Sequence, residues 1–111
     1  MESITWQEFE RIEMRVGTII EVSDFPEAQK PAYRLHIDFG AYGIKKSSAQ
    51  ITDLYDKESL IGKQIIAVVN FPPKQIGKWM SECLVLGLVG DANGVILLQP
   101  ERPAENGLQV G

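Results

Sequence analysis

The sequence predicts an all-β fold, a small barrel of antiparallel strands preceded by a short helix. Two observations predict it. Short runs rich in β-branched residues, such as residues 14–22 and 64–71, are interrupted by glycine-, proline- and asparagine-containing segments. Residues 33–39 alternate strictly between apolar and polar side chains, which is the pattern of a strand with one buried face.

Length and composition set the class of protein. The chain has 111 residues, 44% of them apolar, so we expect one domain over residues 1–111 with a packed core. No apolar run reaches the roughly 18 residues of a transmembrane helix. The acidic start "MESITWQEFERIE" lacks the basic and apolar regions of a secretory signal. The single cysteine, Cys83, forms no intrachain disulfide and fits a reducing compartment, so we expect a cytoplasmic protein without membrane insertion.

The first element is a short helix. Thr5 and Glu8 have the spacing of a capping box, and Ile4 and Phe9 that of a hydrophobic staple. Trp6, Phe9 and Ile12 then give the helix one apolar face. A helix this short is unstable alone in water, so it must pack on its own domain or on a second subunit.

The strands follow in a simple order. We expect three strands, at residues 14–22, 32–40 and 44–51. Gly17 indicates a bulge or bend in the first of them. Residues 53–62 form a helical turn ended by Gly62. Two strong strands follow at residues 64–71 and 82–90, then a final strand at 95–100 that Pro100 ends, and a C-terminal strand extension. Three strands, a small helix and two strands is the order of the five-stranded Greek-key OB barrel; another small antiparallel barrel or an α+β sheet is the alternative.

The segment between the two strong strands is unusual for a turn. Residues 70–81 carry Pro72 and Pro73, and then Lys74, Lys78 and Trp79. A tight turn needs only residues such as asparagine and glycine. Proline reduces the entropy that a loop loses on ordering, so we interpret this segment as a preorganised recognition loop.

The sequence lacks the residues that catalysis and metal binding require. Nucleophilic catalysis needs a base beside a nucleophile, and the only histidine, His36, lies in mid-strand with Asp38 as its sole local acid. One cysteine and one histidine cannot build a usual zinc site. The glycine-containing segments lack the lysine and helix of a phosphate loop. We therefore expect no enzyme activity, no metal and no cofactor.

The net charge of −4 argues against a bulk nucleic-acid binder, but the charges are unevenly distributed. Residues 28–80 contain eight basic and four acidic residues, whereas both flanking segments are acidic. The middle of the chain is thus basic, unless folding scatters these charges.

Several segments together resemble a known family. "RIEMRVGTIIEV", "SSAQI", "VVNFPPKQIGKWMSECLVLG" and "QPERPAENG" resemble the tRNA-binding-domain family, the OB-fold module also found at the C-terminus of many methionyl-tRNA synthetases. "KPAYRLHIDFG", "KKSSAQIT" and "NFPPKQIG" are similar to its CsaA branch of bacterial secretion chaperones. The resemblance covers essentially the whole chain. It implies a homodimer of OB barrels, whose interface we expect to include Trp6, Phe9 and Ile12.

Two ligands accompany this family, and each predicts a set of residues. A tRNA-binding face needs cations for phosphates, with planar or hydroxyl groups for bases and riboses, on strands two and three and nearby loops. That set is Lys30, Arg34, Lys45, Lys46, Ser48, Gln50, Lys74, Lys78 and Ser81. The chain departs from the tRNA-binding pattern, with Gly77-Lys78 in place of Arg-Gly and Cys83-Leu84 in place of Gly-Met.

Polypeptide binding needs adaptable apolar surface. The candidates are Phe71, Ile76, Trp79 and Met80, of which we expect Trp79 and Met80 to be the more exposed. The resemblance to the CsaA branch implies a non-enzymatic chaperone that binds unfolded or export-bound polypeptides, with the export machinery as a further partner. The alternative is a tRNA-binding protein, and a dimer without a ligand is the third, weaker possibility.

Overall fold

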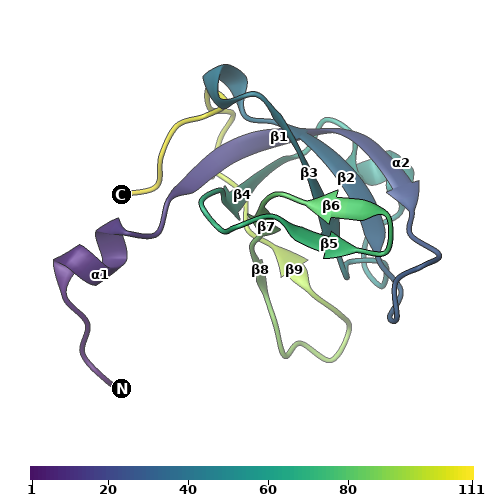
Figure 1. The fold of residues 1–111 in the computed structure, drawn as a ribbon, viewed down its shortest axis with the longest axis horizontal. Helices are drawn as coiled ribbons and strands as arrows, with labels where there is room; N and C mark the ends of the chain where they lie inside the picture. The colour runs from purple at the N-terminus through teal and green to yellow at the C-terminus, as the bar shows by residue number, and fades with distance from the viewer.

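A computed structural model describes all residues, 1–111. Its centre is a five-stranded antiparallel sheet in the order β3-β2-β1-β4-β7, which curls into a barrel (Figure 1). The strands are β1 (Met14–Asp24), β2 (Tyr33–Asp38), β3 (Ile44–Ala49), β4 (Gln64–Val68) and β7 (Leu84–Val85). A 3-10 turn, η1 (Gly40–Tyr42), joins β2 to β3.

The barrel is nearly closed by contacts between β3 and the residues just before β7. The Glu82 N–H donates to the Lys46 carbonyl, and the Lys46 N–H donates to Glu82 Oε1, both at 2.8 Å. The buried Ser47 Oγ donates to the Cys83 carbonyl at 2.7 Å. The predicted five-stranded OB barrel is thereby confirmed.

The core follows the predicted alternation. Tyr33, Leu35, Ile37 and Phe39 are all buried, and the intervening Arg34, His36 and Asp38 are half-buried on the outer face. Leu60 of helix α2 (Lys57–Leu60) closes one end of this core and is fully buried. Asp56 caps that helix through a 2.7 Å bond from the Ser59 N–H, which lowers the pKa of the Asp56 carboxyl.

The sequence predicted a bulge or bend at Gly17, and the bulge is not at that residue. The ladder between β1 and β2 shifts register between Ile19 and Glu21 instead. Gly17 serves packing: a Cβ there would lie 2.6 Å from Ile37 Cγ2 and 2.7 Å from Phe39 Cε1. Two buried side chains of the barrel therefore occupy the space that a larger residue would need.

The N-terminal helix α1 (Trp6–Glu10) projects away from the barrel (Figure 1). The predicted capping box is present: the Glu8 N–H donates to Thr5 Oγ1 at 3.2 Å, and the Thr5 N–H donates to Glu8 Oε1 at 3.0 Å. None of the helical residues is buried, and Trp6 is 75% exposed. The helix thus does not bury its apolar side chains against its own barrel.

The segment predicted as a loop contains a short β-hairpin, β5 (Lys74–Ile76) with β6 (Trp79–Ser81). Gly77 has φ of 59° at its two-residue turn, whereas Lys78 does not have positive φ. Glycine at the first turn position is the signature of a type II′ hairpin. The short sequence "KQIGKWMS" therefore carried a hairpin signal that the loop interpretation missed.

The last part of the chain is less regular than expected. The predicted strand over 82–90 is divided into β7 and β8 (Gly87–Leu88), and β8 pairs with β9 (Ile96–Leu97). The C-terminal extension pairs with β1, because the Val16 N–H donates to the Leu108 carbonyl at 3.0 Å and the Val110 N–H to the Met14 carbonyl at 2.8 Å. No helix in the structure has the length and hydropathy needed to cross a membrane.

Candidate binding cleft

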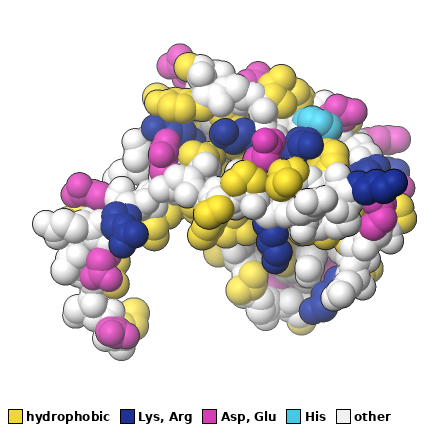
Figure 2. Space-filling model, viewed as in Figure 1, with side chains coloured by type: hydrophobic (Ala, Val, Ile, Leu, Met, Phe, Trp, Pro, Cys, Tyr) yellow, Lys and Arg dark blue, Asp and Glu magenta, His cyan; other side chains and the backbone are white.

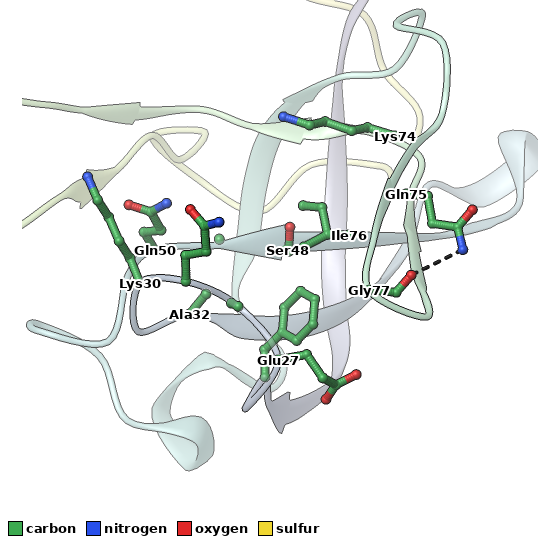
Figure 3. Close-up of a pocket in the computed structure, with 13 residues that line it drawn as sticks. Glu27, Lys30, Ala32, Ser48, Gln50, Lys74, Gln75, Ile76 and Gly77 are labelled. Carbon is green, nitrogen blue, oxygen red and sulfur yellow. Dashed lines mark hydrogen bonds between the residues drawn. The ribbon is translucent and has the colours of Figure 1, made fainter.

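A cleft of about 520 Å³ opens on one side of the barrel, between the loop after β1, the end of β3 and the β5–β6 hairpin (Figure 3). We call it the hairpin cleft. Its lining consists of Phe25, Glu27, Ala28, Gln29, Lys30, Ala32, Ser48, Ala49, Gln50, Lys74, Gln75, Ile76 and Gly77. Loops after the first and fourth strands flank the usual ligand face of OB folds.

The lining combines a modest apolar surface with many hydrogen-bonding groups. Phe25 and Ala32 are buried, and Ile76 is half-buried beside them on the cleft wall. Figure 3 shows the side chains of Lys30 and Lys74 extending toward the same side of the cleft, with Glu27 at the opposite end. The cleft therefore offers apolar contact, neutral polar groups and a positive rim to one ligand.

Trp79 fixes the hairpin to the barrel. Its indole Nε1–H donates to the Ser47 carbonyl at 3.0 Å. The His36 ring meets the indole edge to face at 5.4 Å, and the Arg34 guanidinium and Lys46 amino group lie 5.4 Å and 5.0 Å from its centroid. Cations over an indole face are attracted by its quadrupole. The wall of the hairpin cleft is thus held in place before any ligand binds.

The expected exposure of Trp79 and Met80 was wrong, because both side chains are half-buried. Phe71 is the exposed member of the polypeptide set, at 54%. It does not reach the hairpin cleft but lies in a separate groove described below. Of the four predicted polypeptide-binding residues, only Ile76 lines the cleft.

The predicted tRNA-binding residues divide between several surfaces. Lys30, Ser48, Gln50 and Lys74 line the cleft. Arg34 and Lys46 lie beside it on the outer face of β2 and β3 around Trp79. The remaining members, Lys45, Lys78 and Ser81, lie outside the cleft lining.

Lys45 lies on the other face of β3 from Lys46. It pairs with the buried Ile37, whereas Lys46 pairs with His36 on the outer face, and successive side chains of a strand point to opposite faces. Lys78 occupies the hairpin turn and is exposed, and Ser81 Oγ makes only a 3.5 Å contact to the Cys83 carbonyl. The structure therefore does not bring these three residues to the cleft.

Sequence reasoning missed much of the wall that the loop after β1 supplies, including Phe25, Glu27 and Gln29. Two prolines, Pro26 and Pro31, lie in this loop, as two prolines precede the hairpin. Paired prolines in both loops were the available signal for a cleft with two stiff walls.

The outer face next to the cleft has a mixed charge. Arg34 Nε donates to Ser23 Oγ at 3.1 Å, and His36 Nδ1 lies 3.2 Å from Glu21 Oε2. Figure 2 shows basic, acidic and apolar side chains interspersed on the face that carries the hairpin, without a continuous basic field. Folding has therefore scattered part of the positive charge that the middle of the chain carries.

The one thiol is unsuited to nucleophilic chemistry. Cys83 is buried behind β3, and burial raises the pKa of its thiol to about 11. Because the thiolate is the reactive form, this cysteine is a core residue. No cluster of three or more histidine, cysteine, aspartate or glutamate side chains has metal-binding geometry.

A second surface is apolar and lies between α1 and the barrel. A groove of about 560 Å³ is lined by Ile4, Glu8, Arg11, Ile12, Val68, Asn70, Phe71 and Leu84. Ile4, Ile12, Phe71 and Leu84 in it are all exposed. We call it the helix groove. Side chains of this size rarely gather at a solvent-exposed site without a partner.

Comparisons with known proteins agree with this architecture. The structure is similar to a chaperone CsaA from Bacillus anthracis (48% identity, TM-score 0.93, 99% of this chain and 100% of the other). It is equally similar to a CsaA chaperone protein from Picrophilus torridus (55% identity, TM-score 0.93, 98% and 100%).

The sequence is also related to a much longer enzyme. It is 33% identical over 110 residues to the methionine–tRNA ligase of Pyrococcus horikoshii and spans 15% of that protein's length. The family model described as a putative tRNA binding domain matches residues 14–109. This family is a binding domain and not a catalytic one, and the chain belongs to it.

Proposed function

We propose that this protein is a non-enzymatic chaperone of the cytoplasm that binds unfolded or export-bound polypeptides in the hairpin cleft. The observation that carries the proposal is the cleft itself. It pairs an apolar patch, Phe25 and Ile76, with polar side chains that suit a peptide main chain. A site that must accept many sequences needs such general contacts.

Two further observations support this proposal. Both CsaA proteins named above are called chaperones, and their similarity extends over at least 98% of this chain. The cleft walls are fixed by Trp79 and by prolines, and a preorganised site loses less free energy on binding.

The substitution Ile76→Glu tests the site. It puts a charge on the apolar part of the cleft, so affinity for a reduced, carboxymethylated polypeptide should fall about tenfold or more. Ile61→Glu is the matched control, because Ile61 is 55% exposed and lies outside the cleft. Binding is measured by fluorescence anisotropy without nucleotide. Equal affinity of the two variants, or no binding by the unmodified protein, would contradict the proposal.

The proposed working form is a homodimer that buries the helix groove. Helix α1 is too short to be stable alone, yet none of its side chains is buried and Trp6 is 75% exposed. Phe71 and Leu84 are exposed in the groove beside it. A second copy that covers Trp6, Phe9 and Ile12 removes these side chains from water. In this proposal the export machinery contacts the client polypeptide that the dimer has bound.

The second candidate function is tRNA binding, which the family match and the basic residues near the cleft favour. Lys46→Glu should then weaken tRNA binding and flatten its salt dependence, because fewer phosphate contacts release fewer counterions. Lys45→Glu carries the same charge change on the opposite face and is the control. If both variants bind tRNA as the unmodified protein does, the outer face of β2 and β3 is not the tRNA site.

A further inference from the structure

The outer edge of β3 is the part of the barrel where main-chain groups face the hairpin cleft. Lys46 directs both its N–H and its C=O away from β2, since both bond to Glu82 at 2.8 Å. The β2–β3 register is regular from Ile44 to Ala49. Main-chain groups of an antiparallel edge alternate with a period of two residues. The N–H and C=O of Ser48 therefore point to the same outer edge as those of Lys46.

This edge is covered along only part of its length. Glu82 satisfies the main-chain groups of Lys46. None of the main-chain hydrogen bonds outside the helices and strand ladders involves the Ser48 N–H, and the Ser48 carbonyl receives only a 3.5 Å contact from Ser47 Oγ. Proteins normally block a strand edge with bulges, charges or covering segments. On β3 the covering by Glu82 ends at Lys46, and the cleft begins at Ser48.

The walls around the uncovered edge suit one kind of ligand. Ser48 and Gln50 belong to the cleft lining, as do Phe25 and Ile76. Lys30 and Lys74 lie at the rim (Figure 3). We propose that an extended polypeptide segment adds to the edge of β3 at Ser48, with an apolar side chain against Phe25 and Ile76 and an acidic side chain near the two lysines. This inference rests on the proposed chaperone function and specifies how the client is held.

Binding by strand addition explains how one cleft can accept clients of many different sequences. Main-chain hydrogen bonds are available from almost any polypeptide, whereas side-chain pockets select particular residues. A folded client has its main chain already paired, so an edge of this kind selects unfolded segments. The two lysines add a preference for acidic segments through charge complementarity.

The first test replaces the edge N–H. Ser48→Pro removes the outward N–H, and the β2–β3 ladder remains because that N–H takes no part in it. Ser48→Ala is the matched control, since it removes only the hydroxyl. The probe is a fluorescein-labelled eight-residue peptide of alternating valine and threonine with one central glutamate. We expect Ser48→Pro to weaken its binding about tenfold and Ser48→Ala to leave it within about twofold.

The second test changes the peptide, so it does not depend on the folding of a variant. One series of peptides is N-methylated at the odd-numbered residues, and a second series at the even-numbered residues. Because only one set faces β3 in a strand, one methylated series should lose binding and the other should keep it. Equal effects of both series, or none, would overturn strand addition.

The outcomes separate the two levels of the proposal. If the unmethylated peptide binds but Ser48→Pro and methylation leave its affinity unchanged, strand addition is wrong and the chaperone function stands. If no unfolded polypeptide binds the unmodified protein, both are wrong. If Ser48→Pro weakens tRNA binding and not peptide binding, the edge serves nucleic acid and the inference is overturned.

Discussion

Gly17 lies against two buried side chains that a larger residue would displace. A Cβ would come within 2.6 Å of Ile37 and 2.7 Å of Phe39, both fully buried. The sequence predicted that the backbone at Gly17 is special, but not why. A glycine in a strand has the same local signature whether it marks a bulge or a close approach. Only the packed barrel shows that Ile37 and Phe39, twenty or more positions along the chain, fill the space beside Gly17.

We expect Gly17→Ala to destabilise the protein by about 1–3 kcal/mol, because overpacking a close-packed core forces side chains off their rotamers. Gly111→Ala is the control, as a Cβ there meets no atom within 4 Å. Urea denaturation at one pH measures both free energies of unfolding. A Gly17→Ala protein as stable as the control would show that Ile37 and Phe39 move aside without cost.

At the level of elements, the features that the sequence predicted depend on residues close together in the chain. The features that it did not predict depend on residues far apart in the chain. The alternation of residues 33–39 and the capping box of α1 depend on near neighbours, and both were predicted correctly. The position of Trp79 depends on Ser47, Arg34 and Lys46 of two distant strands, and its predicted exposure was wrong. Likewise, the sequence analysis placed Lys45 and Lys46 in one tRNA-binding set because they are neighbours in the chain. In strand β3 their side chains point to opposite faces.

The β5–β6 hairpin should loosen when its anchor is removed. Trp79→Ala loses the indole bond to Ser47 and the contacts with Arg34 and Lys46. We expect amide exchange of residues 74–81 to accelerate about tenfold or more, while amides of β1 and β4 keep their protection. Met80→Ala serves as the control from the same strand. Unchanged exchange in the hairpin, or equal acceleration throughout the barrel, would mean that Trp79 is not a local anchor.

At the scale of the whole molecule, the apolar side chains left exposed lie partly on α1 and the helix groove. Trp6 on α1 is 75% exposed, and Phe71 in the helix groove is 54% exposed. Helix α1 is too short to be stable alone. The sequence indicated that this helix needs a partner but could not name it, since the same apolar face fits a barrel or a second subunit. The structure shows the helix extended away from its own barrel (Figure 1).

We expect the unmodified protein to be a dimer in solution and Trp6→Glu to be a monomer, because a buried unpaired carboxylate is costly. Ile76→Glu and Ile61→Glu should remain dimeric, since neither residue lies on α1 or lines the helix groove. Sedimentation equilibrium gives each mass. A monomeric unmodified protein would exclude the proposed assembly, as would a Trp6→Glu protein that still dimerises.

The central claim is that the hairpin cleft binds unfolded polypeptide. The most direct measurement is an NMR titration of the ¹⁵N-labelled protein with an unlabelled, permanently unfolded polypeptide, in the absence of nucleotide. Our account predicts that the largest amide shift changes fall on the non-proline residues of segments 25–32, 48–50 and 74–77, which contain the cleft lining. Shift changes confined to other surfaces, or none at saturating polypeptide, would contradict it.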